Sequence, residues 1–368
     1  MAQTFDLTTG SLALHFRRLA VPAAIGMVFT TLYNVVDVFF AGLIGTAAQA
    51  GLAISFQAFF LFITFGFGLG AAMTALVGNA IGAGARDEAR LVAARGIGFG
   101  LIITGVLMVL AWFLGPELIK IVSTEGDYRE AGTRYFIVLI LAIPGFIMSF
   151  GINGLLQSQG DTVSMQRAQI AAFFANIVLN PVLVFGIPGL WDGIGFNGIA
   201  ISTVLSQTGV MVYVGCRLMR TDLMIGLTRS CFRPATATYV EIAKQMLPVT
   251  MTMFVMMSAG FIVQFYLKSF GTSAVAAYGV ALRVEQLFLL PVFGLTGALL
   301  PIAAQNFGAG NHDRVRQALF DCWKFGWMFM AVACPILYFA SPLLMRSFTD
   351  DPEVIAIGVS YLRIDGFI

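Results

Sequence analysis

The sequence predicts an all-α protein that crosses a membrane many times and contains two copies of one helical unit. Hydrophobic residues make up 58% of the 368 residues and charged residues only 11%, whereas soluble domains carry about 25% charged residues. Segments 96–114 and 136–160 contain no charged residue, and about 20 such residues cross the hydrocarbon core of a bilayer. The chain is therefore expected to lie in a lipid bilayer.

An internal repeat is the observation that defines the fold most closely. Segment 22–90 recurs without a gap as segment 248–316, at a spacing of 226 residues. Many membrane transporters are built by such duplication, with the substrate site between the two copies. The matching positions include Pro22 and Pro248, Gly68 and Gly294, Asp87 and Asp313, and Arg90 and Arg316, and Tyr135 matches Tyr361 further along.

Apolar stretches between charged joints predict ten membrane-spanning helices. The triplets Gly82-Ala83-Gly84 and Gly308-Ala309-Gly310 lack the lysine of a phosphate-binding loop and are expected to end two of these helices as C-caps. The helices are expected near residues 17–41, 48–80, 93–115, 133–157, 165–187, 195–217, 244–267, 274–306, 318–341 and 354–368.

The even number of helices before the central loop predicts how the chain divides into lobes. Six helices precede the loop Thr221–Lys244 and return the chain to its starting side, so both copies insert in the same sense. The first lobe is predicted over residues 1–225, with six helices, and the second over 226–368, with about four. The counterpart of Arg220 would be residue 446, so we expect an incomplete second lobe and a native protein of roughly 450 residues with twelve spans.

Basic residues predict the orientation. Fourteen of the 21 lysines and arginines fall on one set of loops and helix ends, which also holds the N-terminus, and seven fall on the other. By the positive-inside rule, the first set and the N-terminus are expected in the cytoplasm, with the protein in the inner (plasma) membrane.

Asp37 is the first candidate for functional chemistry. Thr30, Tyr33, Asn34 and Asp37 follow one another at i, i+3, i+4 and i+7, which places them in one polar stripe on an apolar helix. A carboxylate inside the membrane marks a functional site, because it costs at least a few kcal/mol to bury. It can bind a proton or a cation such as Na⁺. The alternative is that Asp37, about 28 Å along the helix from Arg18, merely reaches water on the outer side.

The fifth predicted helix offers the next candidates. Asn176 and Asn180 lie one turn apart, and Pro181 follows them. Proline removes a backbone hydrogen bond and can expose carbonyl groups near the asparagines. The alternative is that these amides only hold helices together. Thr203 and Gln207 on the sixth helix form a similar polar pair, and Asn153 on the fourth is a further candidate for a cavity.

Glu285 is the acidic candidate of the second copy. It lies two residues after Arg283, so the two side chains do not share a helix face. Glu285 is either a second ion-binding carboxylate or a structurally neutralised one. Some of the 17 methionines and 34 phenylalanines are expected to line a cavity for lipophilic, often cationic ligands.

The sequence contains no motif of a common enzyme class. Both histidines, His15 and His312, lie on the predicted cytoplasmic side, and there is no HExxH, GxSxG or phosphate-binding loop. The four cysteines lack metal-type spacing, and no basic patch indicates a nucleic-acid partner. We expect no enzyme activity, no cofactor other than a coupling ion and no metal site apart from Na⁺ at Asp37.

Several segments together resemble the multidrug and toxic compound extrusion family of secondary transporters. The resemblance implies twelve helices in two six-helix lobes that face each other as a V. It implies export of drugs and toxic compounds coupled to inward movement of protons or sodium ions. The segments are Pro22, the run Tyr33–Gly42, Gly78–Gly84, Gly154–Asp161, Asn176–Pro181 and Leu282–Gln286.

The resemblance also suggests roles for individual residues. Asp37 is similar to the family's coupling carboxylate on the first helix, and Asn176 to an asparagine of the DinF-like branch, which we favour. Asn180 stands where that branch often carries an aspartate, which leaves one acid fewer. Thr203 resembles a neighbouring hydroxyl, and segment 254–258 lacks the seventh-helix glutamate of another branch.

These observations lead to one functional hypothesis and two alternatives. The chain is expected to be an antiporter, functional as a monomer, that exports small organic molecules. Tyr33, Asn34, Asn153, Gln207 and Glu285 are expected around the substrate cavity. The ion site is placed in the first lobe, and Pro22 and Pro181 are the expected hinges. A flippase for lipid-linked precursors is the first alternative, although it needs basic residues deep in its cavity. A membrane-embedded enzyme or scaffold is the second.

Overall fold

The computed structural model describes residues 5–123 and 125–365. Within this part of the chain, eight helical stretches are long and apolar enough to cross a membrane. The α-helices are α1 (Leu12–Ile44), α2 (Thr46–Gly82), α3 (Arg86–Val122), α4 (Asp127–Leu139), α5 (Ile143–Gln157), α6 (Val163–Phe185), α7 (Asn197–Leu218), α8 (Thr236–Leu267), α9 (Thr272–Gly308), α10 (His312–Arg346) and α11 (Pro352–Asp365).

The predicted all-helical membrane fold is confirmed, but most helices are longer than the apolar runs indicate. α3 begins at Arg86 instead of residue 93, and α8 begins at Thr236 instead of residue 244. Charged first turns such as Asp87 and Glu88 of α3 suit the positive end of the helix dipole, so the helix continues beyond its apolar segment. α6 instead ends at Phe185, two residues early, because Gly186 adopts a left-handed backbone with φ of 81°.

The predicted helix 133–157 is interrupted. It consists of α4, a 3-10 turn over Ile140–Ala142 and α5. Pro144 explains the interruption, since proline has no N–H to donate to the carbonyl group of Ile140 and the backbone tightens into a 3-10 turn ahead of it.

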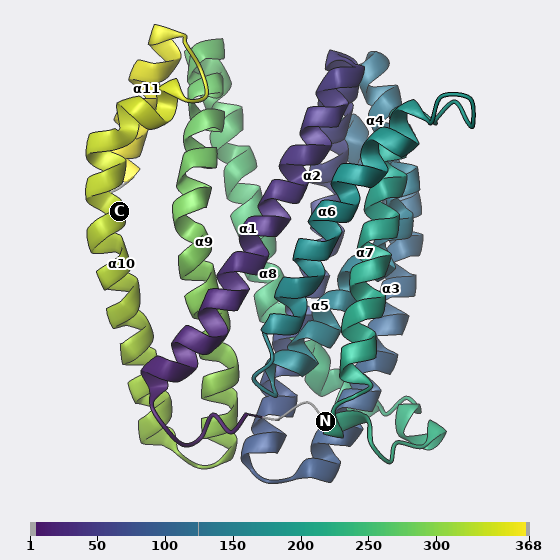
Figure 1. Ribbon diagram of the computed structural model, residues 1–368, viewed down its shortest axis with the longest axis vertical. Helices are drawn as coiled ribbons and strands as arrows, with labels where there is room; N and C mark the ends of the chain where they lie inside the picture. Colours follow the sequence, from purple (N-terminus) through teal and green to yellow (C-terminus); the bar gives the residue numbers. More distant parts are fainter. Residues whose placement is uncertain (1–4, 124, 366–368) are drawn as a thin grey trace.

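The first helix of each copy of the repeat packs against the second helix of the other copy. α1 packs along α9, and its repeat mate α8 packs along α2, while α2 and α9 also contact each other. Figure 1 shows the helices α8–α11 beside the helices α2–α7, with α1 crossing between the two groups. The groups lie close together at the end that carries the turns between α2 and α3 and between α9 and α10, and they spread apart toward the other end.

Glycines on α2 and α9 allow this close approach. A Cβ atom at Gly68 would lie 2.7 Å from the carbonyl oxygen of Met246, and one at its repeat mate Gly294 would lie 2.8 Å from that of Ala20. Ala20 and Met246 are themselves 226 residues apart. Reciprocal contacts of this kind are what a twofold axis between the copies produces.

The same symmetry holds where α2 and α9 end. A Cβ atom at Gly82 would overlap the carbonyl group of Gln305, and one at its mate Gly308 would overlap that of Asn79. Both helices close with the same C-cap, in which Gly84 and Gly310 have φ of 73° and 75°. The predicted C-caps at these two triplets are therefore present.

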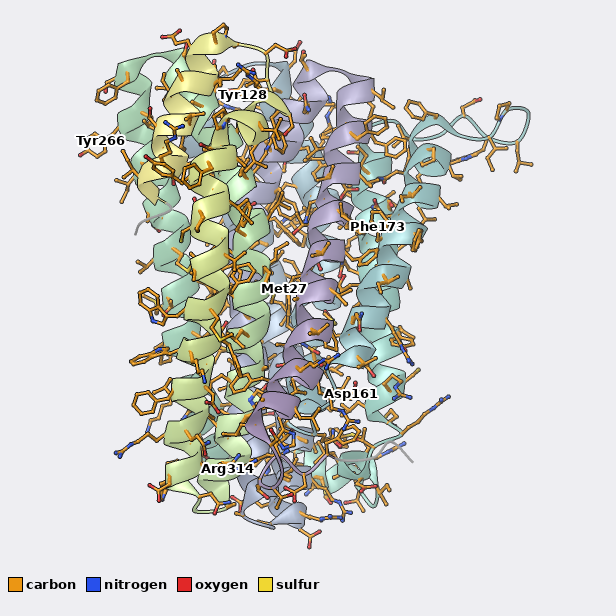
Figure 2. All side chains as sticks on the ribbon, turned by 60° about the vertical axis from the view of Figure 1, so that its left-hand side comes forward. Met27, Tyr128, Asp161, Phe173, Tyr266 and Arg314 are labelled. Atoms are coloured by element: carbon orange, nitrogen blue, oxygen red, sulfur yellow. The ribbon has the colours of Figure 1, made fainter. Side chains whose placement is uncertain are left out.

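We call the end of the bundle to which most of the lysines and arginines belong the basic end. It carries the turns at Gly84, Gly160 and Gly310. Figure 2 shows Asp161 and Arg314 toward this end, and Tyr128 and Tyr266 toward the opposite end.

An N-terminal segment, residues 5–10, crosses the basic end and contacts both copies. Leu7 is 1% exposed, its N–H donates to Gln305 Oε1 at 2.9 Å, and its carbonyl oxygen accepts from Asn306 Nδ2 at 3.0 Å. The N–H of Phe5 donates to the carbonyl group of Gln159, at the end of the first copy's α5.

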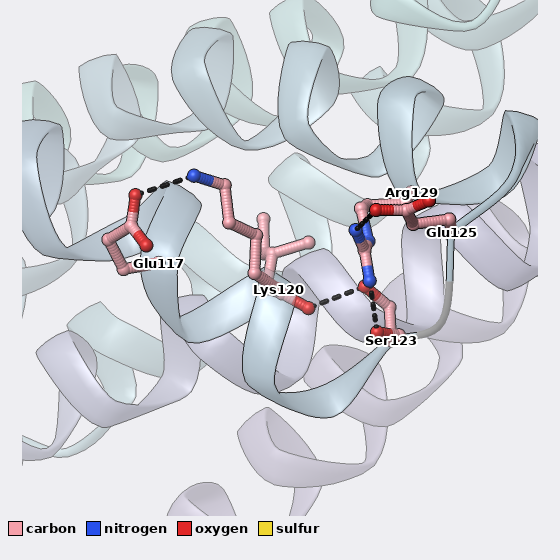
Figure 3. Close-up of polar contacts among 6 residues, drawn as sticks. Glu117, Lys120, Ser123, Glu125 and Arg129 are labelled. Atoms are coloured by element: carbon pink, nitrogen blue, oxygen red, sulfur yellow. Dashed lines mark hydrogen bonds and ion pairs between the residues drawn. The ribbon is translucent and has the colours of Figure 1, made fainter.

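Three basic residues of the opposite end, Lys120, Arg129 and Arg134, pair locally with glutamates. Lys120 contacts Glu117 at 2.7 Å, and Arg129 contacts Glu125 at 3.7 Å while it donates to Ser123 (Figure 3). These three residues therefore add little free positive charge to the opposite end.

Candidate functional site

Asp37 lies at the centre of a buried polar cluster formed by α1, α6 and α7. Only 4% of the residue is exposed. Its Oδ1 accepts hydrogen bonds from Asn176 Nδ2 and Asn180 Nδ2, both at 2.9 Å, and its Oδ2 accepts one from Thr203 Oγ1 at 3.2 Å. The four residues predicted as an ion site thus meet, although 139 to 166 positions separate Asp37 from its partners.

A second set of contacts holds these donors in place. Asn180 Nδ2 also lies 3.2 Å from Asn176 Oδ1, and Asn176 Nδ2 lies 3.3 Å from Ser202 Oγ. Asn176, Asn180 and Ser202 are completely buried. Within the described part of the chain, no lysine or arginine forms an ion pair with Asp37. Its charge is compensated by neutral donors, which favour the ionised carboxylate without cancelling its charge.

The cluster also holds buried oxygen atoms without hydrogen-bond partners in the described residues. Tyr33 Oη lies near Thr203 and Asn176 but makes no hydrogen bond of normal geometry. Asn180 Oδ1 is likewise buried without a partner, and so is Oε1 of Gln207, which lies one turn after Thr203 on α7. Carboxylate, amide and hydroxyl oxygens are the groups that hard cations prefer, and the carboxylate can equally take up a proton.

Three other predicted residues lie outside this cluster. Asn34 donates to the carbonyl group of Thr30 on its own helix at 2.9 Å. Asn153 is on α5, and its Oδ1 is buried with no partner in the described residues. Glu285 belongs to α9 and accepts a hydrogen bond from the hydroxyl group of Tyr361 at 3.1 Å. The predicted stripe on α1 therefore divides, since Tyr33 and Asp37 are buried while Asn34 bonds its own backbone.

The two predicted hinges lie inside unbroken helices. Pro22 is the eleventh residue of α1, and Pro181 follows Asn180 directly in α6. Each proline leaves the carbonyl group four residues earlier, in Arg18 and Ile177, without its usual helical donor. Any bending at these positions therefore loses fewer hydrogen bonds than elsewhere in the two helices.

The sequence analysis did not predict three residues that lie at or near the site. Ser202 and Ser206 flank Thr203 on the buried face of α7, at a spacing of four residues that could have indicated them. Tyr135 of α4 is 1% exposed and stacks on Phe196 with 4.7 Å between ring centroids. It lies near enough to Asp37 to interact electrostatically.

Comparison with known protein families shows to which family the chain belongs. The family model described as MatE matches residues 22–182 and 248–368. The chain belongs to the MatE family. The two matched segments begin 226 residues apart, which is the spacing of the internal repeat.

Individual relatives agree with this assignment. The chain is 28% identical to a probable multidrug resistance protein NorM of Thermotoga maritima, over 95% of this chain and 75% of the relative. It is 26% identical to an FAD transporter of Shewanella oneidensis, over 92% of this chain and 74% of the relative. A solved structure of a multidrug resistance MATE family transporter in an outward-facing conformation aligns with a TM-score of 0.89 at 23% identity, over 99% of this chain and 80% of that one.

These similarities confirm several predictions made from the sequence. The protein is a multi-pass membrane transporter of the MATE family and not an enzyme. Relatives named for multidrug resistance and multidrug export place drug efflux within its family.

Proposed function

We propose that this MATE transporter exports small organic molecules in exchange for protons or sodium ions that bind at Asp37. The observation that carries the proposal is a buried carboxylate that receives three neutral hydrogen bonds. A charge in the membrane is costly unless it is compensated, and partial compensation leaves the site ready to take up a cation.

Ion binding at Asp37 changes the contacts between α1 and its neighbours. The N–H groups of Asn176 and Asn180 favour the ionised carboxylate, so a proton on Asp37 weakens at least one of these hydrogen bonds. A sodium ion would instead attract the oxygen atoms of the amides, which requires the side chains to turn. Protonation therefore holds α1 less firmly against α6, whereas a bound sodium ion replaces the amide N–H contacts with contacts to the amide oxygen atoms.

α1 also provides the path from this site to the second copy. It contacts α6 on one side and α9 on the other, where Ala20 packs on Gly294. A shift of α1 that accompanies ion binding therefore alters an interface between the copies. Alternating access follows if the reciprocal glycine contacts at the basic end separate in one state and close in the other.

The basic end is proposed to face the cytoplasm. Arg17, Arg18, Arg86 and Arg167 lie toward this end, and no ion pair includes them within the described part of the chain. At the opposite end, Lys120 and its neighbouring arginines pair with glutamates within one helical turn. Free basic residues favour the cytoplasmic side. One chain contains both copies of the repeat, so we propose that a monomer functions alone.

Transport by purified protein in liposomes tests this proposal. Efflux of a fluorescent organic cation is measured with a pH gradient alone and then with a sodium gradient alone. Acceleration by either gradient is expected and identifies the coupling ion. Transport that ignores both gradients would contradict ion antiport.

The nature of the cargo is tested in the same liposomes. Similarity to an FAD transporter makes a dinucleotide a second candidate. Competition by FAD against the organic cation is measured at equal concentrations. Inhibition by FAD, together with gradient-driven FAD uptake, would favour an anionic cargo over a lipophilic cation.

A further inference from the structure

A cavity of about 220 Å³ lies at the basic end, away from Asp37. Three arginines from three different helices line it, namely Arg18 of α1, Arg167 of α6 and Arg217 of α7. Asp161 is the acidic residue in its lining, and Phe5 of the N-terminal segment forms part of the wall. The lining therefore carries an excess of positive charge.

Asp161 leaves most of this positive charge uncompensated. Its Oδ1 accepts the N–H of Ser164 at 2.9 Å, so the carboxylate caps the first turn of α6. Its remaining contact with a base is to Arg217, at 3.8 Å, and Arg217 Nε donates to Ser164 Oγ at 3.1 Å. In the described residues, neither Arg18 nor Arg167 has an ion-pair partner. An anion with several oxygen atoms suits two such guanidinium groups.

The two arginines without an ion-pair partner each precede exposed apolar residues on their own helix, and the Arg18 guanidinium also lies 3.2 Å from the centroid of the Phe5 ring. α1 and α6 pack against each other, and the rings of Phe29 on α1 and Phe174 on α6 lie 6.4 Å apart between centroids, so the two stripes belong to neighbouring helices. A charged group followed by parallel apolar surface matches a phospholipid and not a free ion. The stripe residues are Val21, Val28 and Leu32 on α1 and Phe174 and Val178 on α6.

Gln159 adds a polar partner for the headgroup. It lines the same cavity and is only 4% exposed. Its Nε2 donates to the carbonyl group of Leu155 at 3.0 Å, but its Oε1 is buried without a donor in the described residues. An unpaired buried acceptor costs about 1–3 kcal/mol. A ligand with a hydroxyl group beside its phosphate would supply the missing donor.

We propose that this cavity binds the headgroup of an anionic, hydroxyl-bearing phospholipid such as phosphatidylglycerol, with its phosphate between Arg18 and Arg167. The acyl chains lie along the apolar stripes of α1 and α6. The inference concerns a lipid site and is independent of the transported substrate and of the ion at Asp37.

Lipid-dependent stability of the detergent-purified full chain tests the proposal. The melting temperature is measured with added phosphatidylglycerol, with phosphatidylcholine and with inorganic phosphate alone. We expect phosphatidylglycerol to raise Tm by about 3 °C or more, with little effect of the other two. A rise of equal size with inorganic phosphate alone would overturn the assignment to a lipid.

A charge-matched pair of variants locates the site. Loss of two charge-assisted contacts in R18Q/R167Q should weaken binding of phosphatidylglycerol by at least about tenfold. R17Q/R220Q removes two exposed arginines of the same end that do not line the cavity, and it should bind the lipid normally. Native mass spectrometry counts retained lipid independently of Tm. Equal retention in both double variants would overturn the proposal.

Discussion

Gly82 and Gly308 occupy matching positions of the repeat and make the same contact, but Asp37 and its repeat mate Val263 have nothing in common. The glycines each face a carbonyl group of the other copy. Asp37 is buried and hydrogen-bonded to two helices, whereas Val263 is an apolar residue with 41% of its surface exposed. The contacts that join the copies are therefore symmetric, while the buried acid at this position belongs to the first copy alone.

The difference has a physical explanation. Interfaces related by a twofold axis require each surface to fit its partner reciprocally, so a change in one copy disturbs contacts that involve the other. A polar cluster inside one copy has no such constraint. Hydrogen bonds to Asp37 come from α6 and α7 of the same copy, and they can differ in the second copy without affecting the interface.

The largest effect is expected from breaking the shared packing. Gly82→Ala and Gly308→Ala each place a methyl group against backbone that cannot move aside, so each should lower the free energy of unfolding by about 3 kcal/mol. Gly105→Ala in α3 is the control, because a Cβ atom there meets nothing within 4 Å. Thermal unfolding in detergent measures all three. Destabilisation by only one of the two interface variants would contradict equal packing in the copies.

The next effect concerns the donors of the first copy. Asn180→Leu removes a hydrogen bond of 2.9 Å from Asp37, which makes the charged carboxylate less favourable by about 1.5 kcal/mol. A proton bound at Asp37 should then be released more slowly, and proton-driven transport turnover should fall about tenfold. Ser258→Ala is a suitable control, since its hydroxyl bonds only the backbone of its own helix in the described contacts. Unchanged turnover in Asn180→Leu would argue against a role for this amide.

Glu285→Gln sharpens the comparison from the side of the second copy. The hydroxyl group of Tyr361 donates to Glu285, and an amide oxygen can accept the same bond. If coupling belongs to the first copy, the rate of ion-driven transport should change by less than about twofold. Replacing the hydrogen bond to the Glu285 carboxylate with one to an amide changes the free energy only slightly. Loss of coupling in this variant would place a second ion site in α9.

The smallest effect on transport is expected from Cys231→Ser. Chemical labelling of Cys231 instead reports which side of the membrane the basic end faces. This thiol lies in the loop at the basic end, and hydrogen bonds from Thr228 hold its pKa below the usual value. More thiolate is therefore present at neutral pH, and maleimide should react readily. An impermeant maleimide should label Cys231 in right-side-out vesicles only after they are opened. Cys231→Ser, which should transport normally, identifies the labelled site, and labelling of intact vesicles would reverse the proposed orientation.

The fold could be predicted further than the site. Apolar runs and the repeat predicted the helical membrane architecture, and the glycine triplets predicted the ends of α2 and α9. The 3-10 turn before Pro144 and the N-terminal segment at Leu7 were missed. A short polar segment before the first helix carries no periodic signal, and its partners Gln305 and Asn306 lie about 300 positions away.

Spacing along a helix predicted candidates for the site but not their orientation. Asn34 and Asp37 share a stripe in the sequence, yet Asn34 bonds its own backbone and Asp37 is turned into the bundle. The rotation of a helix depends on packing with its neighbours, which spacing alone does not determine. Ser202 shows the converse, since its role in holding Asn176 follows from how α6 and α7 meet.

Ion-driven transport by Asp37→Asn tests the central claim most directly. The variant keeps the size of the side chain but cannot carry the charge, and Val263→Asn provides the matched change in the second copy. In proteoliposomes with the effective ion gradient, substrate transport by Asp37→Asn should fall to the level of empty liposomes, while Val263→Asn should retain gradient-driven transport. Normal gradient-driven transport by Asp37→Asn would contradict the assignment of coupling to the first copy.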